Sequence, residues 1–162
     1  MRRVIVNSTP LIVLCNVGRL EILRTLYTEI TIPEAVFAEV TKREDSACQI
    51  VKKSLDWIRV ERILNPSDKK MYQAKLHDGE VEVMILAQEG VRADLMILDD
   101  NAAKKTAKYL GLTVTGMLGI LLKVKKAGII PTIAPVLEEI KKNGFYISGT
   151  VERMVLSEAG ES

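Results

Sequence analysis

The sequence predicts a three-layer α/β/α protein, in which a central parallel sheet carries helices on both faces. Short runs of branched apolar residues, typical of buried strands, alternate along the chain with segments whose apolar residues recur at helical spacing. Such alternation builds right-handed βαβ units and hence a parallel sheet. The length of 162 residues is that of one domain. We expect this single domain over residues 1–150 and a C-terminal tail, with a helix as one option, over residues 151–162.

The first half of the chain contains three expected strands and the helices between them. The strands, each ended by turn formers, are RRVIVN (2–7), TEITIP (28–33) and DWIRVERI (56–63). Helical spacing predicts helices over residues 10–26, 33–44 and 46–55. Gly18 should divide the first of these into two pieces, and Pro33 should halt the second strand and begin the next helix. NPSDKK (65–70) is expected to be a surface turn with a helix following it.

The second half is more regular. Glycines that close the segments predict helices over residues 76–90, 101–111, 117–128 and 134–144. The expected strands are ADLMILDD (93–100), which is the clearest buried strand of the chain, LTVTG (112–116) and FYISG (145–149).

Composition narrows the class of protein. Hydrophobic residues make up 48% of the chain and charged residues 27%, the balance of a globular protein. No apolar run approaches the roughly 20 residues that span a bilayer, and polar residues 7–9 with Pro10 interrupt the only stretch that resembles a signal peptide. We therefore expect a cytoplasmic protein without a membrane segment. Cys15 and Cys48 lack metal-site spacing and are expected to be reduced and buried.

The charge pattern leaves two interpretations open. The formal net charge of +2 is too small to indicate nucleic-acid binding by itself. Lysines occur in pairs, which could line one face or simply solvate several helices, at residues 52–53, 69–70, 104–105, 125–126 and 141–142.

Polar and acidic residues stand where a parallel sheet gathers functional groups. Asn7 ends the first strand, Glu39 lies in the helix after the second, Glu80 opens a helix, and Asp99 with Asp100 ends the strongest strand. The carboxyl ends of parallel strands converge on a crevice. Oxygen ligands suit Mg²⁺ and Mn²⁺, and a nuclease needs several carboxylates to hold such ions against a phosphate. The sequence therefore indicates a metal-dependent site.

Each candidate also has a structural interpretation. Glu39 could be a solvated helix residue, and Glu80 could serve only the helix dipole. Glu82 should lie on another face of the helix, in solvent or in a supporting role. Asp99 and Asp100 repel one another, which favours a cation or basic partner, although one of them could cap the following helix. The single histidine has no nucleophile beside it, and no phosphate-binding glycine motif is present.

Several stretches together resemble the PIN-domain family, especially its small stand-alone prokaryotic members. They lie within residues 3–148 and are VIVNSTPLIVLCNVGRLEIL, IPEAVFAEV, LHDGEVEVMILAQE, LMILDDNAAKKTAKYLGLTVTGMLGILLKVKKAGIIP and LEEIKKNGFYIS. Such proteins are similar to the toxins of type II toxin–antitoxin pairs. The resemblance implies a PIN-like fold and an endoribonuclease that depends on Mg²⁺ or Mn²⁺. It also implies RNA as substrate, a small antitoxin protein as partner and a homodimer.

The resemblance assigns roles to the candidate residues. Glu39, Glu80 and Asp99 or Asp100 match the catalytic acids and metal ligands, and the first ligand position falls on Asn7. Two hydroxyls, those of Thr9 and Ser8, would support the site, with Thr9 orienting residue 7.

Asn7 departs from the aspartate that is usual in the family, and a neutral amide oxygen holds a metal ion more weakly. The first alternative function is therefore a PIN-like module that binds RNA or a protein without cleaving. Asn7 could also merely cap the turn before Pro10. A phospho-acceptor receiver domain is a weaker alternative, because the first strand does not end in an acidic pair.

Overall fold

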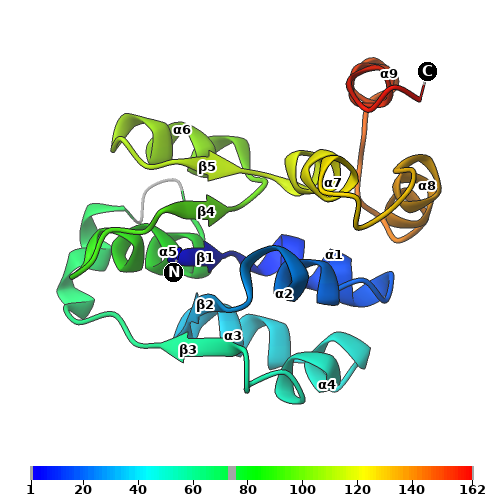
Figure 1. Ribbon diagram of the computed structural model, residues 1–162. Helices are drawn as coiled ribbons and strands as arrows, with labels where there is room; N and C mark the ends of the chain where they lie inside the picture. Colours follow the sequence, from blue (N-terminus) through cyan, green and yellow to red (C-terminus); the bar gives the residue numbers. More distant parts are fainter. Residues whose placement is uncertain (1, 73–75, 162) are drawn as a thin grey trace.

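The computed structural model describes residues 2–72 and 76–161, which form a parallel sheet between layers of helices (Figure 1). The sheet has five strands in the order β3-β2-β1-β4-β5. Their bounds are β1 (Val4–Val6), β2 (Ile30–Pro33), β3 (Ile58–Glu61), β4 (Leu95–Ile97) and β5 (Val114–Thr115). All four pairings are parallel. The predicted three-layer α/β/α fold is confirmed.

Strands β1 and β4 form the buried centre of the sheet. Every residue of both strands is buried, because helices cover both faces and the strands consist of apolar residues. The chain runs from β1 toward β2 and β3 on one side, and β4 and β5 continue the sheet on the other. Such a switch point is where parallel sheets bind ligands. The Asn7 N–H donates to the Ile97 carbonyl at 2.9 Å, so the carboxyl ends of β1 and β4 lie side by side.

The helices of the first half follow the predicted pattern. They are α1 (Ser8–Asn16), α2 (Glu21–Tyr27), α3 (Glu34–Thr41) and α4 (Ser46–Lys52). Gly18 separates α1 from α2 and has a φ of 69°, a conformation that glycine adopts without steric cost. Helix α3 begins directly after Pro33 and buries Val36 and Val40, while Glu39 is exposed on another side.

The middle of the chain contains a short 3₁₀ helix at the predicted surface turn. This element, η1, spans Pro66–Met71. The helix expected after it falls partly on residues 73–75, which lie outside the described residues. The four predicted helices of the second half are present as α5 (Asp78–Gln88), α6 (Asn101–Tyr109), α7 (Met117–Lys126) and α8 (Ala134–Lys142).

The strand predicted at residues 145–149 is wrong. Residues 145–148 have no regular structure, and the Ser148 hydroxyl accepts a hydrogen bond from the Val151 N–H to begin α9 (Gly149–Glu158). Phe145 is half-buried and Ile147 buried, whereas Tyr146 between them is exposed. This alternating burial is that of a strand, but here the segment packs its apolar side chains without pairing to the sheet.

Helix α9 lies beyond α7 and α8, far from the sheet, and carries the C-terminus (Figure 1). It packs against α7 and buries only Val155. The side chain of Glu161 accepts hydrogen bonds from the backbone N–H groups of Ile133 and Ala134, at 2.8 and 3.0 Å, and pairs with Lys125 at 2.9 Å. The end of the chain is therefore fastened to the start of α8.

Two further predictions concern the cysteines and the membrane. Cys15 and Cys48 are free and buried, as predicted. Burial, with a contribution from the charge of Asp45, raises the pKa of the Cys15 thiol to about 12, so this thiol stays protonated at neutral pH. Within the described residues, none of the helices has both the length and the apolar character needed to cross a membrane.

Candidate functional site

Asn7 lies at the carboxyl end of β1, where the chain turns into α1. It occupies the N-cap position of α1 and is only 4% exposed, yet its side chain makes no capping hydrogen bond. Its backbone is extended, and its N–H donates a hydrogen bond to the Ile97 carbonyl of β4. The Asn7 amide therefore does not have the helix-capping role that sequence reasoning left open.

Gly79 brings the start of α5 close to Asn7 and Glu39. A Cβ atom at position 79 would lie 3.1 Å from Glu39 Oε2 and 3.6 Å from Asn7 Oδ1. The Ser8 hydroxyl donates to the same Glu39 oxygen at 2.7 Å. Side chains from β1, α1 and α3 thus meet at the first turn of α5, and the absence of a side chain at Gly79 lets them do so.

Glu80 follows Gly79 and is buried, with 6% of its surface exposed. Its Oε1 accepts the His77 N–H at 2.9 Å, which caps α5. Burial raises the pKa of the Glu80 carboxyl; the hydrogen bond from His77 opposes this effect, and the negative charges of Asp100 and Glu39 add to it. The Glu80 carboxylate is therefore near enough to the carboxylates of Glu39 and Asp100 to be repelled by both.

The two aspartates after β4 lie in different surroundings. Asp100 is the N-cap of α6, and its Oδ2 accepts the Ala103 N–H at 2.9 Å, which confirms that one of the pair is a helix cap. Asp99 Oδ1 accepts the Met117 N–H at the start of α7 at 3.0 Å. Asp99 Oδ2 is buried and has no hydrogen-bond partner among the described residues. Burial raises the pKa of Asp99, against the effects of the Met117 hydrogen bond and the Lys104 charge.

The four carboxylates share one arrangement. Each has one oxygen fixed by a single donor: Ser8 for Glu39, His77 for Glu80, Met117 for Asp99 and Ala103 for Asp100. Carboxylate and amide oxygens are the donors that Mg²⁺ and Mn²⁺ prefer, so the chemistry of this set fits a hard divalent cation. Within residues 2–72 and 76–161, however, no three Asp, Glu, His or Cys side chains already lie together as a metal-binding group.

The two hydroxyls predicted to support the site differ in placement. Ser8 is buried and donates to Glu39, whereas Thr9 is exposed on the first turn of α1. The hydroxyl that reaches the acidic residues is therefore that of Ser8.

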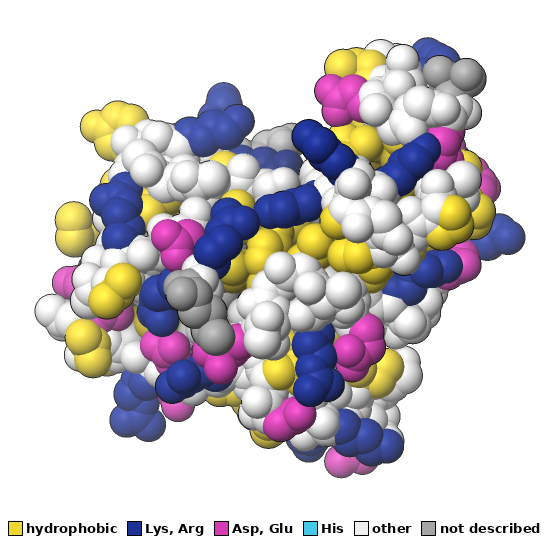
Figure 2. Space-filling model, in the orientation of Figure 1, with side chains coloured by type: hydrophobic (Ala, Val, Ile, Leu, Met, Phe, Trp, Pro, Cys, Tyr) yellow, Lys and Arg dark blue, Asp and Glu magenta, His cyan; other side chains and the backbone are white. Residues whose placement is uncertain are grey.

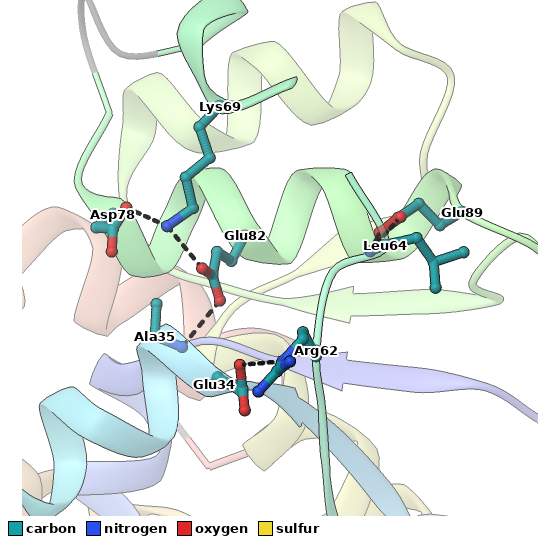
Figure 3. A network of polar contacts seen from close by, with 8 residues as sticks. All are labelled: Glu34, Ala35, Arg62, Leu64, Lys69, Asp78, Glu82 and Glu89. Carbon is teal, nitrogen blue, oxygen red and sulfur yellow. Dashed lines mark hydrogen bonds and ion pairs between the residues drawn. The ribbon is translucent and has the colours of Figure 1, made fainter. Parts of the chain in front are cut away.

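Glu82 has a role that sequence reasoning missed. It is buried rather than solvated, and it accepts the Ala35 N–H in the first turn of α3 at 2.9 Å (Figure 3). Its other oxygen pairs with Lys69 of η1 at 2.7 Å, and Lys69 also pairs with Asp78. One signal was available in the sequence: α3 begins after Pro33, which has no side-chain acceptor for the free N–H groups of that helix.

Basic side chains are distributed rather than gathered on one side. The lysine pairs belong to separate elements, namely α4, η1, α6, α7 and α8 and their ends. Figure 2 shows Lys and Arg side chains interspersed with Asp and Glu over one face, with several around a hydrophobic patch. On this face, the interpretation that lysines solvate several helices fits better than a continuous basic surface.

Comparison with known proteins gives one family. A family model described as a PIN domain matches residues 3–161, which is nearly the whole chain. No sequence among the curated proteins compared matches this chain. The matched region includes every strand of the sheet and all of the candidate site residues. The chain therefore belongs to the PIN-domain family, whose fold is of the nuclease type.

Proposed function

We propose that this protein is an endoribonuclease that uses Mg²⁺ or Mn²⁺ to hydrolyse phosphodiester bonds of RNA. The observation that carries the proposal is the grouping of Asn7, Glu39, Glu80 and Asp100 around the carboxyl ends of β1 and β4. Family membership supports it, since PIN domains are generally dependent on divalent metals and bind RNA. A cation would relieve the repulsion that the buried Glu80 carboxylate meets from the exposed carboxylates of Glu39 and Asp100.

The ligands would be Asn7, Glu39, Glu80 and Asp100, with Asp99 beside them. A bound divalent ion would supply a water of lowered pKa and would offset negative charge on the phosphate. Hydrogen-bond donors of the chain would hold these carboxylates in position: the Ser8 hydroxyl orients Glu39, and the Ala103 N–H orients Asp100. Because Asn7 is neutral, the site would bind the ion less tightly than one with a fifth carboxylate.

A cleavage assay tests this proposal. Labelled single-stranded RNA of mixed sequence is incubated with the protein and Mn²⁺, with Mg²⁺, or with EDTA. We expect cleavage with either metal ion, none with EDTA, and a loss of about 100-fold in Glu80→Gln, since losing a metal ligand costs at least as much as losing a group that orients one, about 10- to 100-fold. Glu138→Gln is the matched control, because Glu138 is an exposed acid of α8. Equal cleavage by Glu80→Gln and the unmodified protein would contradict the proposal.

A second candidate function is supported by two observations. Asn7 lacks charge, and the acids of the described residues do not already converge as a metal group. Both facts favour a PIN-like module that binds RNA or a protein without cleaving it. Binding of RNA without cleavage under Mg²⁺ and Mn²⁺ would support this candidate over the nuclease.

We further propose that the protein is the toxin of a toxin–antitoxin pair and acts in the cytoplasm as a homodimer. Two free, buried cysteines are typical of a reducing compartment. Ile12 of α1 and Leu122 of α7 are only partly buried and offer apolar surface to a second copy. Growth arrest on expression, relieved by the product of an adjacent small gene, tests the toxin role. Sedimentation tests the dimer, and a monomer alone at micromolar concentration would exclude it.

A further inference from the structure

A groove of about 340 Å³ adjoins the acidic site. Its volume is at the lower end of the range of about 300–1,000 Å³ that is usual for small-ligand pockets. Three segments line it: the start of α6 with Asp99, the start of α7, and the connection from α8 into α9. Because Asp99 follows β4, the groove begins at the same carboxyl edge of the sheet as Glu80 and Asp100.

One part of the groove is suited to an anion. Lys104 lines it and takes part in none of the ion pairs of the described residues. A Cβ at Gly116 would lie 2.5 Å from Asp99 Oδ1 and 2.8 Å from Lys104 Nζ, so the glycine lets the ammonium group approach the start of α7 beside the Asp99 carboxylate. The first hydrogen bond of α7 runs from the Ile120 N–H to the Gly116 carbonyl, so the helix itself gives Leu118 and Gly119 no acceptor for their N–H groups.

Another part of the groove is aromatic. Tyr146 lines it with 85% of its surface exposed, and the half-buried Phe145 precedes it. Asn101 and Ser148, which also line the groove, can donate and accept hydrogen bonds. An exposed ring beside a cation and polar side chains is the combination on which the bases of single-stranded nucleic acids stack.

We infer that this groove binds one nucleotide of single-stranded RNA, next to the phosphodiester bond that the acidic site would cleave. The base stacks on Tyr146, and its phosphate faces Lys104 and the start of α7. The inference rests on the proposed function for the identity of the polymer, whereas the groove, Lys104 beside Asp99 and the exposed ring are features of the chain itself. Phosphate at Lys104 would also keep the substrate backbone close to Asp99.

Binding measured without cleavage tests the groove separately from the nuclease. A short fluorescein-labelled single-stranded RNA is titrated with protein in EDTA, and fluorescence anisotropy gives the Kd. We expect Tyr146→Ala to raise the Kd about 5- to 150-fold, the range that follows from losing one base–aromatic stack. Tyr146→Phe, which keeps the ring, should stay within about twofold of the unmodified protein. Tyr109→Ala is the matched control, since Tyr109 is 90% exposed and lies outside the groove lining.

The lysine is tested through salt dependence. Lys104→Gln should lower the slope of log Kd against log salt concentration by about 0.7, the share of one phosphate contact on a single strand. Lys105→Gln, an exposed neighbour outside the groove, should change the slope less.

The outcomes separate the two proposals. Equal Kd values for Tyr146→Ala and Tyr109→Ala, or no RNA binding at all, would contradict the proposal that the groove binds a nucleotide. Metal-dependent cleavage alongside that result would still support the proposed nuclease activity. Conversely, RNA binding that depends on Tyr146 in a protein that never cleaves RNA would support the nucleotide site and contradict the nuclease activity.

Discussion

Asn7 places a neutral oxygen in a neighbourhood that is otherwise acidic. Its Oδ1 and Glu39 Oε2 both border Gly79, and Glu80 follows directly. An amide at this position limits the repulsion that the folded chain must bear without a cation, because a further carboxylate here would lie close to Glu39. The same amide lowers the charge available to hold a metal ion. In the proposed metal site, an amide at position 7 would therefore lower metal affinity and raise the stability of the metal-free protein.

Asn7→Asp should reverse this exchange. We expect Mn²⁺ affinity to rise by on the order of 1–3 kcal/mol, about 5- to 150-fold, because a close negative charge is added to a partly shielded site. The metal-free variant should unfold at a lower temperature than the unmodified protein. Calorimetric Mn²⁺ titration and thermal unfolding in EDTA measure both effects. Asn16→Asp, at the exposed end of α1, is the control. Unchanged affinity in Asn7→Asp would remove Asn7 from the metal site.

Glu80 gives a prediction about pH. Burial and the charges of Asp100 and Glu39 raise its pKa above the ordinary value of 4.5, so the folded state binds this proton more tightly than the unfolded state does. The resulting loss of stability is absent below pH 4.5 and grows as pH rises through the folded pKa. Glu80→Gln, which keeps an acceptor for the His77 N–H, should therefore stabilise the metal-free protein at pH 7 but not at pH 4. Urea unfolding at both pH values measures this, and equal differences at the two would contradict it.

Sequence reasoning located the candidate residues but not their contacts. Asn7, Asp99 and Asp100 could be placed at the ends of strands because the apolar runs before them are local signals. The bond between Ser8 and Glu39 could not be predicted, since it depends on how α1 and α3 pack. The sequence also could not show whether Asp99 or Asp100 is the metal ligand. Neighbouring side chains at a strand end point in opposite directions, and the sequence does not reveal which of the two directions faces the site.

At the scale of elements, Glu82 joins the helices that carry two of the acids. It lies on α5 two residues after Glu80, and it accepts the Ala35 N–H of α3, the helix of Glu39. Lys69 adds η1 to the same network (Figure 3). The hydrogen bond between Glu82 and the Ala35 N–H joins α5 to α3. It therefore helps to fix the spacing between the backbones of Glu39 and Glu80.

Glu82→Ala should therefore destabilise the protein by about 1–3 kcal/mol, since it leaves a buried backbone N–H and Lys69 without their acceptor. Figure 3 also shows the matched control, the exposed pair of Glu34 and Arg62 at 3.1 Å. Glu34→Ala should cost less than about 1 kcal/mol, as is usual for surface ion pairs. Chemical denaturation in EDTA measures both variants. Equal costs would show that Glu82 contributes no more than a surface acid.

The type of nearly every element could be predicted, and the exception has a physical reason. Strands and helices were recognised from apolar periodicity and from glycines such as Gly18, which reflect local backbone preference. The segment 145–149 shows the limit of this approach, because aromatic and branched residues favour a strand whether or not a partner strand is present. Sheet pairing is a long-range property, and here Ser148 begins α9 instead.

At the scale of the molecule, the order of strands creates the site. The parallel sheet was predicted, but its order β3-β2-β1-β4-β5 was not, because several orders satisfy the same right-handed connections. This order makes β1 and β4 neighbours, with Val6 beside Ile97. Asn7 and Asp99, far apart in sequence, thereby reach the same edge. The long-range topology, rather than any local motif, gathers the acids.

Two carboxylates attach α9 to α8: Glu152, which pairs with Lys141 of α8 at 2.8 Å, and Glu161. The helix buries only Val155, so apolar packing holds it weakly, whereas the Glu161 carboxylate binds the start of α8 and Lys125. The N–H of Ile133, with help from Lys125 and Ala134, lowers the pKa of Glu161 below 4.5. This contribution to stability is therefore present at neutral pH and is lost as pH falls through the lowered pKa.

Glu161→Gln should loosen α9 without unfolding the sheet. At pH 7 we expect faster amide exchange over residues 149–158, because the neutral amide loses the charge-assisted bonds to Lys125 and to the start of α8. Exchange in the buried strands β1 and β4 should be unchanged. Glu158→Gln is the matched control, since Glu158 is an exposed acid at the end of α9. If both variants exchange like the unmodified protein, then the contact of α9 with α7 and the pair of Glu152 with Lys141 are sufficient to hold the helix. Loosening would also disturb Ser148 and Val151, which line the groove, so Glu161→Gln should weaken RNA binding, whereas Glu158→Gln should not.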